Sequence, residues 1–399
     1  MPELLAPAGD IATARIAMRF GADAVYLGGS MLQLRAGKTG FSMADIKNIA
    51  REAHAMNRRV YVTVNAYAHD EELDALSEYA QRLRDANVDA CIISDPGVMT
   101  IFHASAPELP IHVSTQANCM NSAAAMAYYA MGARRVVPAR ELTMTQLAEM
   151  RRRLPGDMEI ETFVHGAMCM AYSGRCMISA FLTGRSGNRG SCTQPCRWKY
   201  SVVEESRPGM YFPVEETEKG MALFSSRDLN ALAFLDQLVQ IGIESFKIEG
   251  RMKSEYYVAT VVNAYRMRLD AILEGKAADV AALQAELDSV SHRPYSSGFY
   301  FGELANMPGD SGEYEQGCMY IASVDSVLHG RARITLKNKF AAGEALEVLS
   351  PGKTGRVFVA ANILDETGAA CEAATVPSNV YEMDVPDAVR PGDLLRRRI

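Results

Sequence analysis

The feature that most restricts the fold is a regular alternation of short apolar runs with longer amphipathic segments. Helices are expected at 43–56, 71–86, 121–131 and 143–154, because apolar residues recur there at three- and four-residue spacing. Strands that alternate with helices form parallel sheets covered on both faces. Eight such units favour an α/β fold with a closed, TIM-like (β/α)₈ barrel. The eight apolar runs lie at residues 4–6, 24–27, 60–65, 90–94, 111–115, 135–138, 159–164 and 245–249.

An open, doubly wound sheet would give the same local pattern, so the alternation alone leaves both architectures in play. The first run is not followed by GxGxxG, the glycine-rich turn of dinucleotide-binding sheets, which favours the barrel. In barrels the loops that leave the C-terminal strand ends carry the active site. Polar residues at those ends are therefore the first candidates for function.

The regular spacing stops after the seventh strand, where residues 165–243 form a long insertion of different character. The insertion holds four of the eight cysteines and many glycines. We expect a hairpin at 200–204 and 211–215, and a helix that starts near Asp228, with this carboxylate as its N-cap. Loops of this length inside a compact domain are usually functional.

The barrel is expected to occupy residues 1–275, with the insertion inside it. Helices are expected at 255–273 and 277–290, and residues 276–317 are interpreted as a helical connector. From residue 318 the pattern changes to short alternating strands, such as 332–336, 345–349 and 357–359, separated by turn signals. This change predicts a small β-barrel-like domain over 318–399.

The four cysteines of the insertion follow the pattern Cys169-x6-Cys176-x15-Cys192-x3-Cys196. Thiolates are soft ligands that bind iron–sulfur clusters, zinc and copper(I). Zinc ribbons usually carry two close Cys-x2-Cys pairs, and the spacings here are wider. Uneven, glycine-rich spacing favours a 4Fe–4S cluster, whose corners need a loop to wrap around them. A zinc site and reduced structural thiols are the alternatives.

Composition bounds the location and the partners of the protein. It is that of a soluble globular chain, with no signal-peptide pattern and no apolar run of the roughly 20 residues that a membrane span needs. We therefore expect a cytoplasmic protein without membrane association, in which thiols stay reduced. The formal net charge of -7 means that contact with nucleic acid requires a local basic patch.

Such a patch lies in the insertion, where residues 166–200 contain no Asp or Glu but include Arg185 and Arg189. These cations either bind phosphates of a nucleic acid or offset the negative charge of a cluster held by four thiolates. Trp198, the single tryptophan, would stack on a base in the first case. Otherwise it is a core residue.

Several sequence blocks resemble one known family. Residues 161–169 (ETFVHGAMC) and 174–179 (GRCMIS) are similar to the signature of the collagenase-like peptidase family, several members of which are oxygen-independent hydroxylases. Further blocks agree: LAPAG at 5–9, DAVYLG at 23–28, STQ at 114–116, AREL at 139–142, SRDL at 226–229 and KIEGRMK at 247–253. The resemblance strengthens the expectation of a 4Fe–4S cluster on the four cysteines.

The resemblance implies one of three hydroxylase activities. Some members form 5-hydroxyuridine at the tRNA wobble position and depend on prephenate, longer members act on a cytidine of ribosomal RNA, and shorter ones act in ubiquinone synthesis. A barrel followed by one β domain is most similar to the tRNA-acting branch. The expected partners are therefore the tRNA anticodon loop and an electron donor of unknown identity, with prephenate as a metabolite that the reaction would require.

Two other functions stay open. The family name implies a peptidase, although the sequence has neither an HExxH zinc motif nor a GxSxG elbow. The best-placed cysteines also serve better as ligands than as nucleophiles. The remaining hypothesis is an RNA-binding protein without catalytic activity, in which the cluster is purely structural.

Three polar residues at strand ends are the catalytic candidates. His165 ends strand seven and would transfer a proton or bind a cluster sulfur. Glu249 and Arg251 end strand eight, where Arg251 would grip a carboxylate or phosphate. The simpler interpretations are a structural histidine and a structural ion pair.

Further residues are predicted to bind the substrate. Asn65 and Gln116 are polar at the ends of strands three and five, where a core strand would be apolar. Arg140 follows strand six and, like Arg251, would either orient the substrate or form a structural ion pair. Arg185 and Arg189 of the insertion complete the predicted substrate-binding set.

Overall fold

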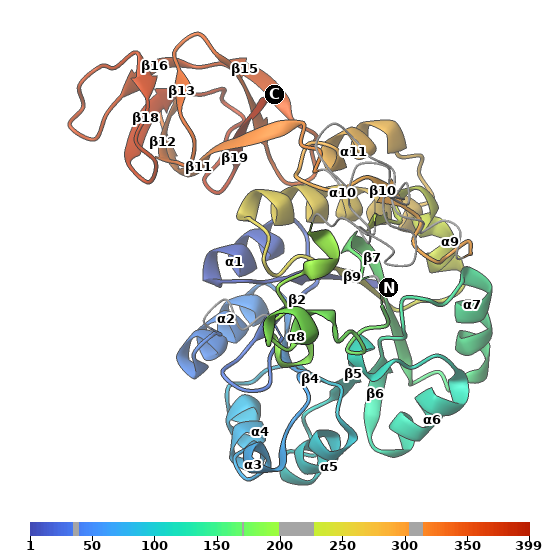
Figure 1. The fold of residues 1–399 in the computed structure, drawn as a ribbon. Coiled ribbons are helices and arrows are strands. Elements are labelled where there is room, and N and C mark those ends of the chain that lie inside the picture. Colours follow the sequence, from blue (N-terminus) through green and yellow to red (C-terminus); the bar gives the residue numbers. More distant parts are fainter. Residues whose placement is uncertain (35–39, 170, 199–226, 303–313) are drawn as a thin grey trace, which may run out of the picture. The chain divides into compact units, whose positions relative to one another are not determined.

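The computed structural model describes residues 1–34, 40–169, 171–198, 227–302 and 314–399 (Figure 1). The hairpin expected at 200–215 lies outside the described residues. In the described part of the chain, no helix is both long enough and apolar enough to cross a membrane. The chain forms two compact units, the first made of Met1–Ala14, Asp23–Lys253 and Arg293–Tyr314 and the second of Arg15–Ala22, Ser254–His292 and Glu315–Ile399.

The first unit contains a closed barrel of eight parallel strands. Strands β1 to β7 pair in chain order, and β9 pairs with both β7 and β1. Ser245 of β9 lies opposite Glu3 of β1 and Glu161 of β7, which closes the ring. The closed barrel predicted from the sequence is therefore confirmed. The strands are β1 (Glu3–Pro7), β2 (Ala24–Gly28), β3 (Arg59–Val64), β4 (Ala90–Ile93), β5 (Ile111–Val113), β6 (Ala133–Val136), β7 (Glu159–Ala167) and β9 (Ser245–Ile248).

Helices follow most of these strands, close to the positions that amphipathic spacing predicts. In α2, Ser42 and Asp45 form a capping box that fixes the first turn, and the apolar stripe is buried. The single helix expected at 71–86 is instead two helices separated by a turn at residues 74–75. The helices are α1 (Ile11–Arg19), α2 (Met43–Ala55), α3 (Asp70–Leu73), α4 (Leu76–Asp85), α5 (Pro96–Ser105), α6 (Ser122–Ala130) and α7 (Met144–Arg153).

Charged side chains from several strands meet inside the barrel. Arg135 Nη1 lies 2.7 Å from Glu3 Oε1 and 2.9 Å from Glu161 Oε2. The second oxygen of Glu161 lies 2.7 Å from Lys247 Nζ. All four residues are buried. Buried charges are tolerated only when they are paired and hydrogen-bonded, and here the pairs form a chain from β1 through β6 and β7 to β9.

The insertion leaves β7 and returns to the barrel wall. It contains α8 (Ile178–Thr183) and the 3₁₀ turns η2 (Gly187–Arg189) and η3 (Pro195–Arg197). It also contains the short strand β8 (Asp228–Asn230), which is antiparallel to the end of β7 and pairs His165 with Asn230. Strand β10 (Tyr295–Ser296) adds to β8, and α9 (Leu235–Gln240) leads into β9.

The helix expected to start near Asp228 begins later, as the 3₁₀ turn η4 (Leu232–Phe234) followed by α9, so the N-cap role of this residue is wrong. Asp228 lies in β8, and its Oδ1 accepts hydrogen bonds from Nε and Nη2 of Arg293 at 3.0 and 2.7 Å. Both residues are buried. A buried carboxylate is stable only when a nearby cation compensates its charge, and Arg293 is that cation. The partner is distant in the sequence, which is why a local pattern could not reveal it.

The second unit contains α10 (Glu255–Leu273), at its predicted bounds, and α11 (Val280–Leu287), shorter than predicted. The C-terminal residues form an antiparallel sheet in the order β15-β14-β19-β11-β12-β18-β16, which confirms a β domain. Its strands are β11 (Cys318–Leu328), β12 (Arg331–Leu336), β14 (Ala345–Leu349), β15 (Arg356–Val359), β16 (Ala361–Leu364), β18 (Val380–Asp384) and β19 (Leu394–Arg398), beside the two-stranded sheet of β13 (Phe340–Ala341) and β17 (Ala373–Ala374).

Candidate active site

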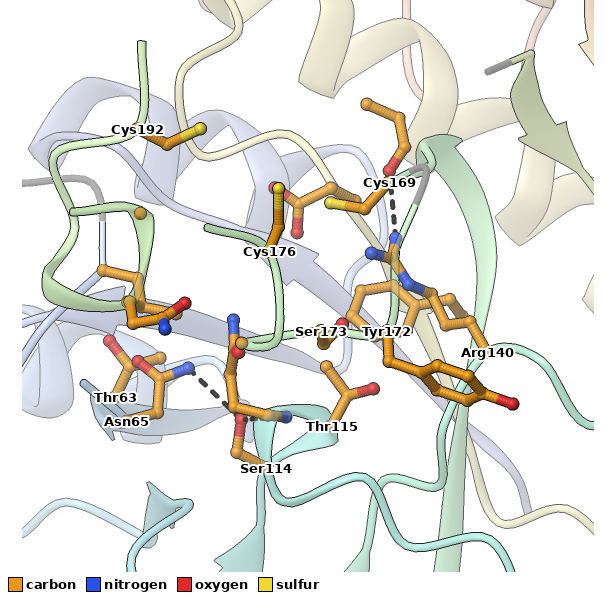
Figure 2. Close-up of a pocket in the computed structure, with 18 of the residues that line it drawn as sticks. Thr63, Asn65, Ser114, Thr115, Arg140, Cys169, Tyr172, Ser173, Cys176 and Cys192 are labelled. Atoms are coloured by element: carbon orange, nitrogen blue, oxygen red, sulfur yellow. Dashed lines mark hydrogen bonds between the residues drawn. The ribbon is translucent and has the colours of Figure 1, made fainter. Parts of the chain in front are cut away.

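A pocket of about 160 Å³ opens at the C-terminal ends of the barrel strands (Figure 2). Enzymes with this barrel carry their active sites at that face. Five buried strand residues form the floor: Tyr26, Thr63, Ile92, Phe163 and Lys247. The walls come from the segments just beyond the strands and from the insertion, and they include Asn65, Ser114, Gln116, Arg140, Glu249, Arg251, Tyr172, Cys169, Cys176 and Cys192.

Lys247 places an ammonium group at the floor. Its Nζ pairs with Glu161 on one side, at 2.7 Å, and lies 4.4 Å from the centre of the Tyr26 ring and 5.7 Å from that of Phe163. A carboxylate and two aromatic rings therefore surround this ammonium group. The ion-pair chain inside the barrel therefore ends in a positive charge beneath the pocket.

Glu249 and Arg251, both predicted from the sequence, line the same pocket. The Tyr26 hydroxyl lies 3.0 Å from the carbonyl oxygen of Ile248 and 3.3 Å from Glu249 Oε2. Arg251 donates from Nη2 to Gln33 Oε1 at 2.6 Å and from Nη1 to the carbonyl oxygen of Leu34 at 3.0 Å. The side chain of Arg251 is buried, so these acceptors fix its guanidinium in the wall.

Neutral polar groups form the opposite wall. Asn65 Nδ2 donates to Ser114 Oγ at 3.3 Å, as Figure 2 shows. Ser114 Oγ also accepts from the backbone of Gln116, at the start of the 3₁₀ turn η1 (Thr115–Ala117). Among the described residues, no group donates to the buried Oδ1 of Asn65. This oxygen therefore lacks the hydrogen-bond partner that buried amide oxygens usually have.

Arg140 links the pocket wall to the start of the insertion. Its Nη1 donates to the carbonyl oxygen of Ala167 at 2.9 Å, and its guanidinium lies 4.9 Å from the centre of the Phe163 ring. Ala167 ends β7 and stands two residues before Cys169. Arg140 therefore holds the backbone from which the first cysteine is presented.

Three of the four predicted ligands, Cys169, Cys176 and Cys192, line the pocket, and Figure 2 shows their side chains directed toward a common space. Cys196 is not among the lining residues. Among the described residues none of the four forms a disulfide bond, and all four lie outside the buried core. Across the described residues, no three His, Cys, Asp or Glu side chains are gathered closely enough to hold a metal ion. The cluster therefore stays a prediction, for which the donors are present and three of them share one cavity.

The other sequence candidates lie elsewhere. His165 is buried in β7 beside Tyr295, with ring centres 5.4 Å apart, and does not line the pocket. Arg185 is exposed and also outside the lining. Arg189 forms a bidentate pair with Glu72 of α3, at 2.6 and 2.8 Å. This hydrogen bonding lowers the pKa of Glu72 to about 2, so the charge of Arg189 is neutralised within the protein.

Sequence reasoning missed the buried strand residues of the floor, three of which carry polar groups. Tyr26, Thr63 and Lys247 lie inside strands, where a pattern of apolar runs treats every position as core. One signal was present in the case of Lys247: a lysine between apolar residues of a buried strand is almost never unpaired. The pattern gives no indication of the partner, because Glu161 belongs to another strand.

Comparison with known proteins finds matches to both the barrel and the C-terminal β domain. Residues 9–307 match the family described as Peptidase family U32, and residues 316–396 match the Peptidase family U32 C-terminal domain. The tRNA hydroxylation protein P of Escherichia coli is 35% identical over 88% of this chain and 86% of its own. The tRNA hydroxylation protein P1 of Bacillus subtilis is 34% identical over 99% and 94%.

A third relative has a different kind of name. A protein named collagenase from Porphyromonas gingivalis is 32% identical over 75% of this chain and 74% of its own. The matches to both family domains, together with relatives above 30% identity over most of both chains, settle the relationship. The chain belongs to peptidase family U32.

Proposed function

We propose that this chain is an RNA hydroxylase that acts on tRNA and forms 5-hydroxyuridine at the wobble position. Two relatives that are similar over most of their length are named for tRNA hydroxylation. The single observation that carries the proposal is a barrel-mouth pocket with neutral hydrogen-bonding groups on one wall and three free cysteines on another. Neutral donors and acceptors match the edge of a nucleobase.

The pocket limits which base can enter. It lies at the strand ends inside the barrel mouth, so a base has to leave its stack to reach the floor. In folded RNA such bases come from single-stranded loops, which include the anticodon loop. Asn65 would accept a hydrogen bond from the base through its Oδ1, and Gln116 beside it would supply further amide groups. Lys247 would place positive charge beneath the base.

The proposal includes a 4Fe–4S cluster on Cys169, Cys176, Cys192 and Cys196. Four free thiols are the donor set of such clusters, and three of them line the pocket. When bound, a cluster of this type passes single electrons. We also propose that the reaction uses no molecular oxygen, requires prephenate and exchanges electrons with a redox partner; because hydroxylation oxidises the base by two electrons, that partner or an oxygen-donating co-substrate has to take them up. The family resemblance supports these three points.

A peptidase remains the second candidate, supported by the name of the collagenase relative. A cysteine nucleophile is activated by an adjacent base, most often histidine. No histidine is among the described residues that line the pocket, and His165 packs beside Tyr295 instead. The geometry therefore favours the hydroxylase.

The substrate class is tested by mass spectrometry of nucleosides from cells with and without the gene, with tRNA and ribosomal RNA analysed separately. We expect 5-hydroxyuridine to disappear from tRNA and hydroxylated cytidine in ribosomal RNA to stay constant. Loss of the ribosomal modification alone would move the activity to another RNA. Intact modification of both RNAs, together with an accumulating peptide, would favour the peptidase.

The cluster is tested on protein purified without oxygen. We expect a brown protein with about four irons per chain. Serine at Cys169, Cys176, Cys192 or Cys196 should remove the colour and the iron. The matched control is Cys371→Ser, because Cys371 is a free cysteine of the β domain outside the pocket. A colourless, zinc-containing wild-type protein would overturn this part of the proposal.

A further inference from the structure

The insertion exposes an unusual amount of apolar surface. Phe181 of α8 is 88% exposed, and Met177 just before the helix is 64% exposed. The side chains of Tyr172, Ile178, Leu182 and Trp198 are also exposed. Apolar side chains exposed singly are normal, but several exposed within one short segment point to an interaction site. Here six of them fall within residues 172–198.

The same segment has a charge opposite to that of the chain. Residues 166–200 contain no Asp or Glu, although the chain carries a net charge of -7. Arg175 and Arg185 are exposed, and no ion pair links either to another described residue. Arg189 differs, because Glu72 neutralises it. Apolar and aromatic groups among uncompensated cations complement a polyanion with stackable rings.

This surface is held firmly at the edge of the pocket. Ser179 of α8 lines the pocket, donates to the carbonyl oxygen of Arg185 at 2.7 Å and accepts from the backbone of Thr193 at 3.0 Å. Turn η3 packs against α8, and Trp198 follows it directly. Helix α8 therefore turns a small polar residue toward the pocket and Phe181 toward solvent.

We propose that this α8 surface, formed by Tyr172, Arg175, Met177, Phe181, Leu182 and Arg185, binds the single-stranded RNA loop that delivers the target base. The inference rests on the proposed RNA hydroxylase function and names the surface that the loop uses. One base that flanks the target stacks on Phe181, while Arg175 and Arg185 contact the adjacent phosphates. Charge complementarity favours RNA over a protein partner, because the surface offers cations and aromatic rings without a carboxylate.

The test is the affinity of the full chain for a fluorescent anticodon stem-loop, measured by anisotropy at fixed salt. Stacking on one aromatic side chain is worth about 1–3 kcal/mol, so Phe181→Ser should weaken binding about 5- to 150-fold. Phe181→Tyr should retain the affinity. Leu328→Ser is the control, because Leu328 is an exposed apolar residue of the β domain. None of these changes should alter thermal stability, since Phe181 is almost fully exposed.

Unchanged affinity of Phe181→Ser would overturn the inference. If that variant binds the stem-loop normally but loses tRNA hydroxylation in cells, the α8 surface serves a protein partner such as an electron donor. These results are separate from failure of the proposed function, which would appear in the wild-type protein as no tRNA modification. Wild-type modification with an unaffected Phe181→Ser variant would leave the hydroxylase in place and remove only its docking surface.

Discussion

Replacement of Glu161 by Gln should destabilise the barrel more than any surface change, because Glu161 is the carboxylate between two buried cations. It accepts hydrogen bonds from Lys247 Nζ at 2.7 Å, Arg135 Nη1 at 2.9 Å and Ser245 Oγ at 3.2 Å, and its exposed fraction is zero. Burial raises its pKa, but Lys247 and Arg135 outweigh burial and hold the pKa below its ordinary value.

The size of the stability loss depends on which carboxylates still pair with Arg135 and Lys247 after the substitution. Arg135 keeps Glu3 at 2.7 Å and Glu159 at 2.6 Å. Lys247 loses the carboxylate with which it pairs and remains 5% exposed. Removal of one partner from a buried ion pair costs about 3–5 kcal/mol. Against a total stability of about 5–15 kcal/mol, we expect a loss of about 3 kcal/mol or more.

The assay is urea unfolding of the full chain followed by far-UV circular dichroism, with equal slopes required for comparison. The matched control is Glu159→Gln. Glu159 also pairs with Arg135, but the side chain of Glu159 is 41% exposed. That loss should stay within about 1 kcal/mol. The double variant Glu161→Gln/Lys247→Met should recover part of the stability, because the uncompensated charge is gone. A loss below about 1 kcal/mol for Glu161→Gln alone would refute this reasoning.

The ion pairs also set a pH dependence. The pKa of Glu161 is lowered in the folded protein, so its contribution is fully present above the pKa of about 4.5 that the unfolded chain has. It is lost as the pH falls through the lower, folded value. We therefore expect the barrel to lose stability below about pH 4.5, and the Glu161→Gln variant to show a smaller loss over the same range.

Four further changes test the site and the segment that leaves it. Lys247→Met should lower single-turnover hydroxylation at least about tenfold, or 1.4 kcal/mol, with tRNA affinity unchanged, because the floor charge lies inside the pocket. Arg185→Ala should reduce the slope of log affinity against log salt by about 0.7–1, whereas Arg189→Ala should not, since Glu72 already neutralises it. Gly166→Ala should lower the melting temperature, with a cost of about 1–3 kcal/mol, because Gly166 has φ +107° and an added Cβ would lie 2.5 Å from a backbone carbonyl oxygen.

The elements that the sequence predicted best are those whose signal is local. Helix α2 repeats buried Ile46, Ile49, Ala50 and Ala53 on one face, so its period of 3.6 residues is visible without any partner. The strand runs and their order were visible for the same reason. Closure of the barrel was inferred from the number of units, and it is the pairing of β9 with β1 and β7 that establishes it.

The features that the sequence did not reveal depend on partners far along the chain. Asp228 resembled an N-cap because serines precede it and a helical pattern follows, whereas the distant Arg293 decides its environment. From the sequence Arg189 was predicted to bind a phosphate, whereas in the structure it pairs with Glu72 of α3. Asn65, Gln116 and Glu249 could be predicted as pocket residues because they are polar and stand at strand ends, where a core strand would carry apolar residues.

The central claim is that tRNA hydroxylation depends on the cysteines of the insertion. The most direct measurement is the 5-hydroxyuridine content of tRNA from a deletion strain that carries the wild-type gene, a Cys176→Ser gene or a Cys371→Ser gene at equal protein levels. The wild-type and Cys371→Ser genes should restore the modified nucleoside, and Cys176→Ser should not. Full restoration by Cys176→Ser would contradict the account, because an enzyme that works without this thiol does not use the four cysteines as one ligand set.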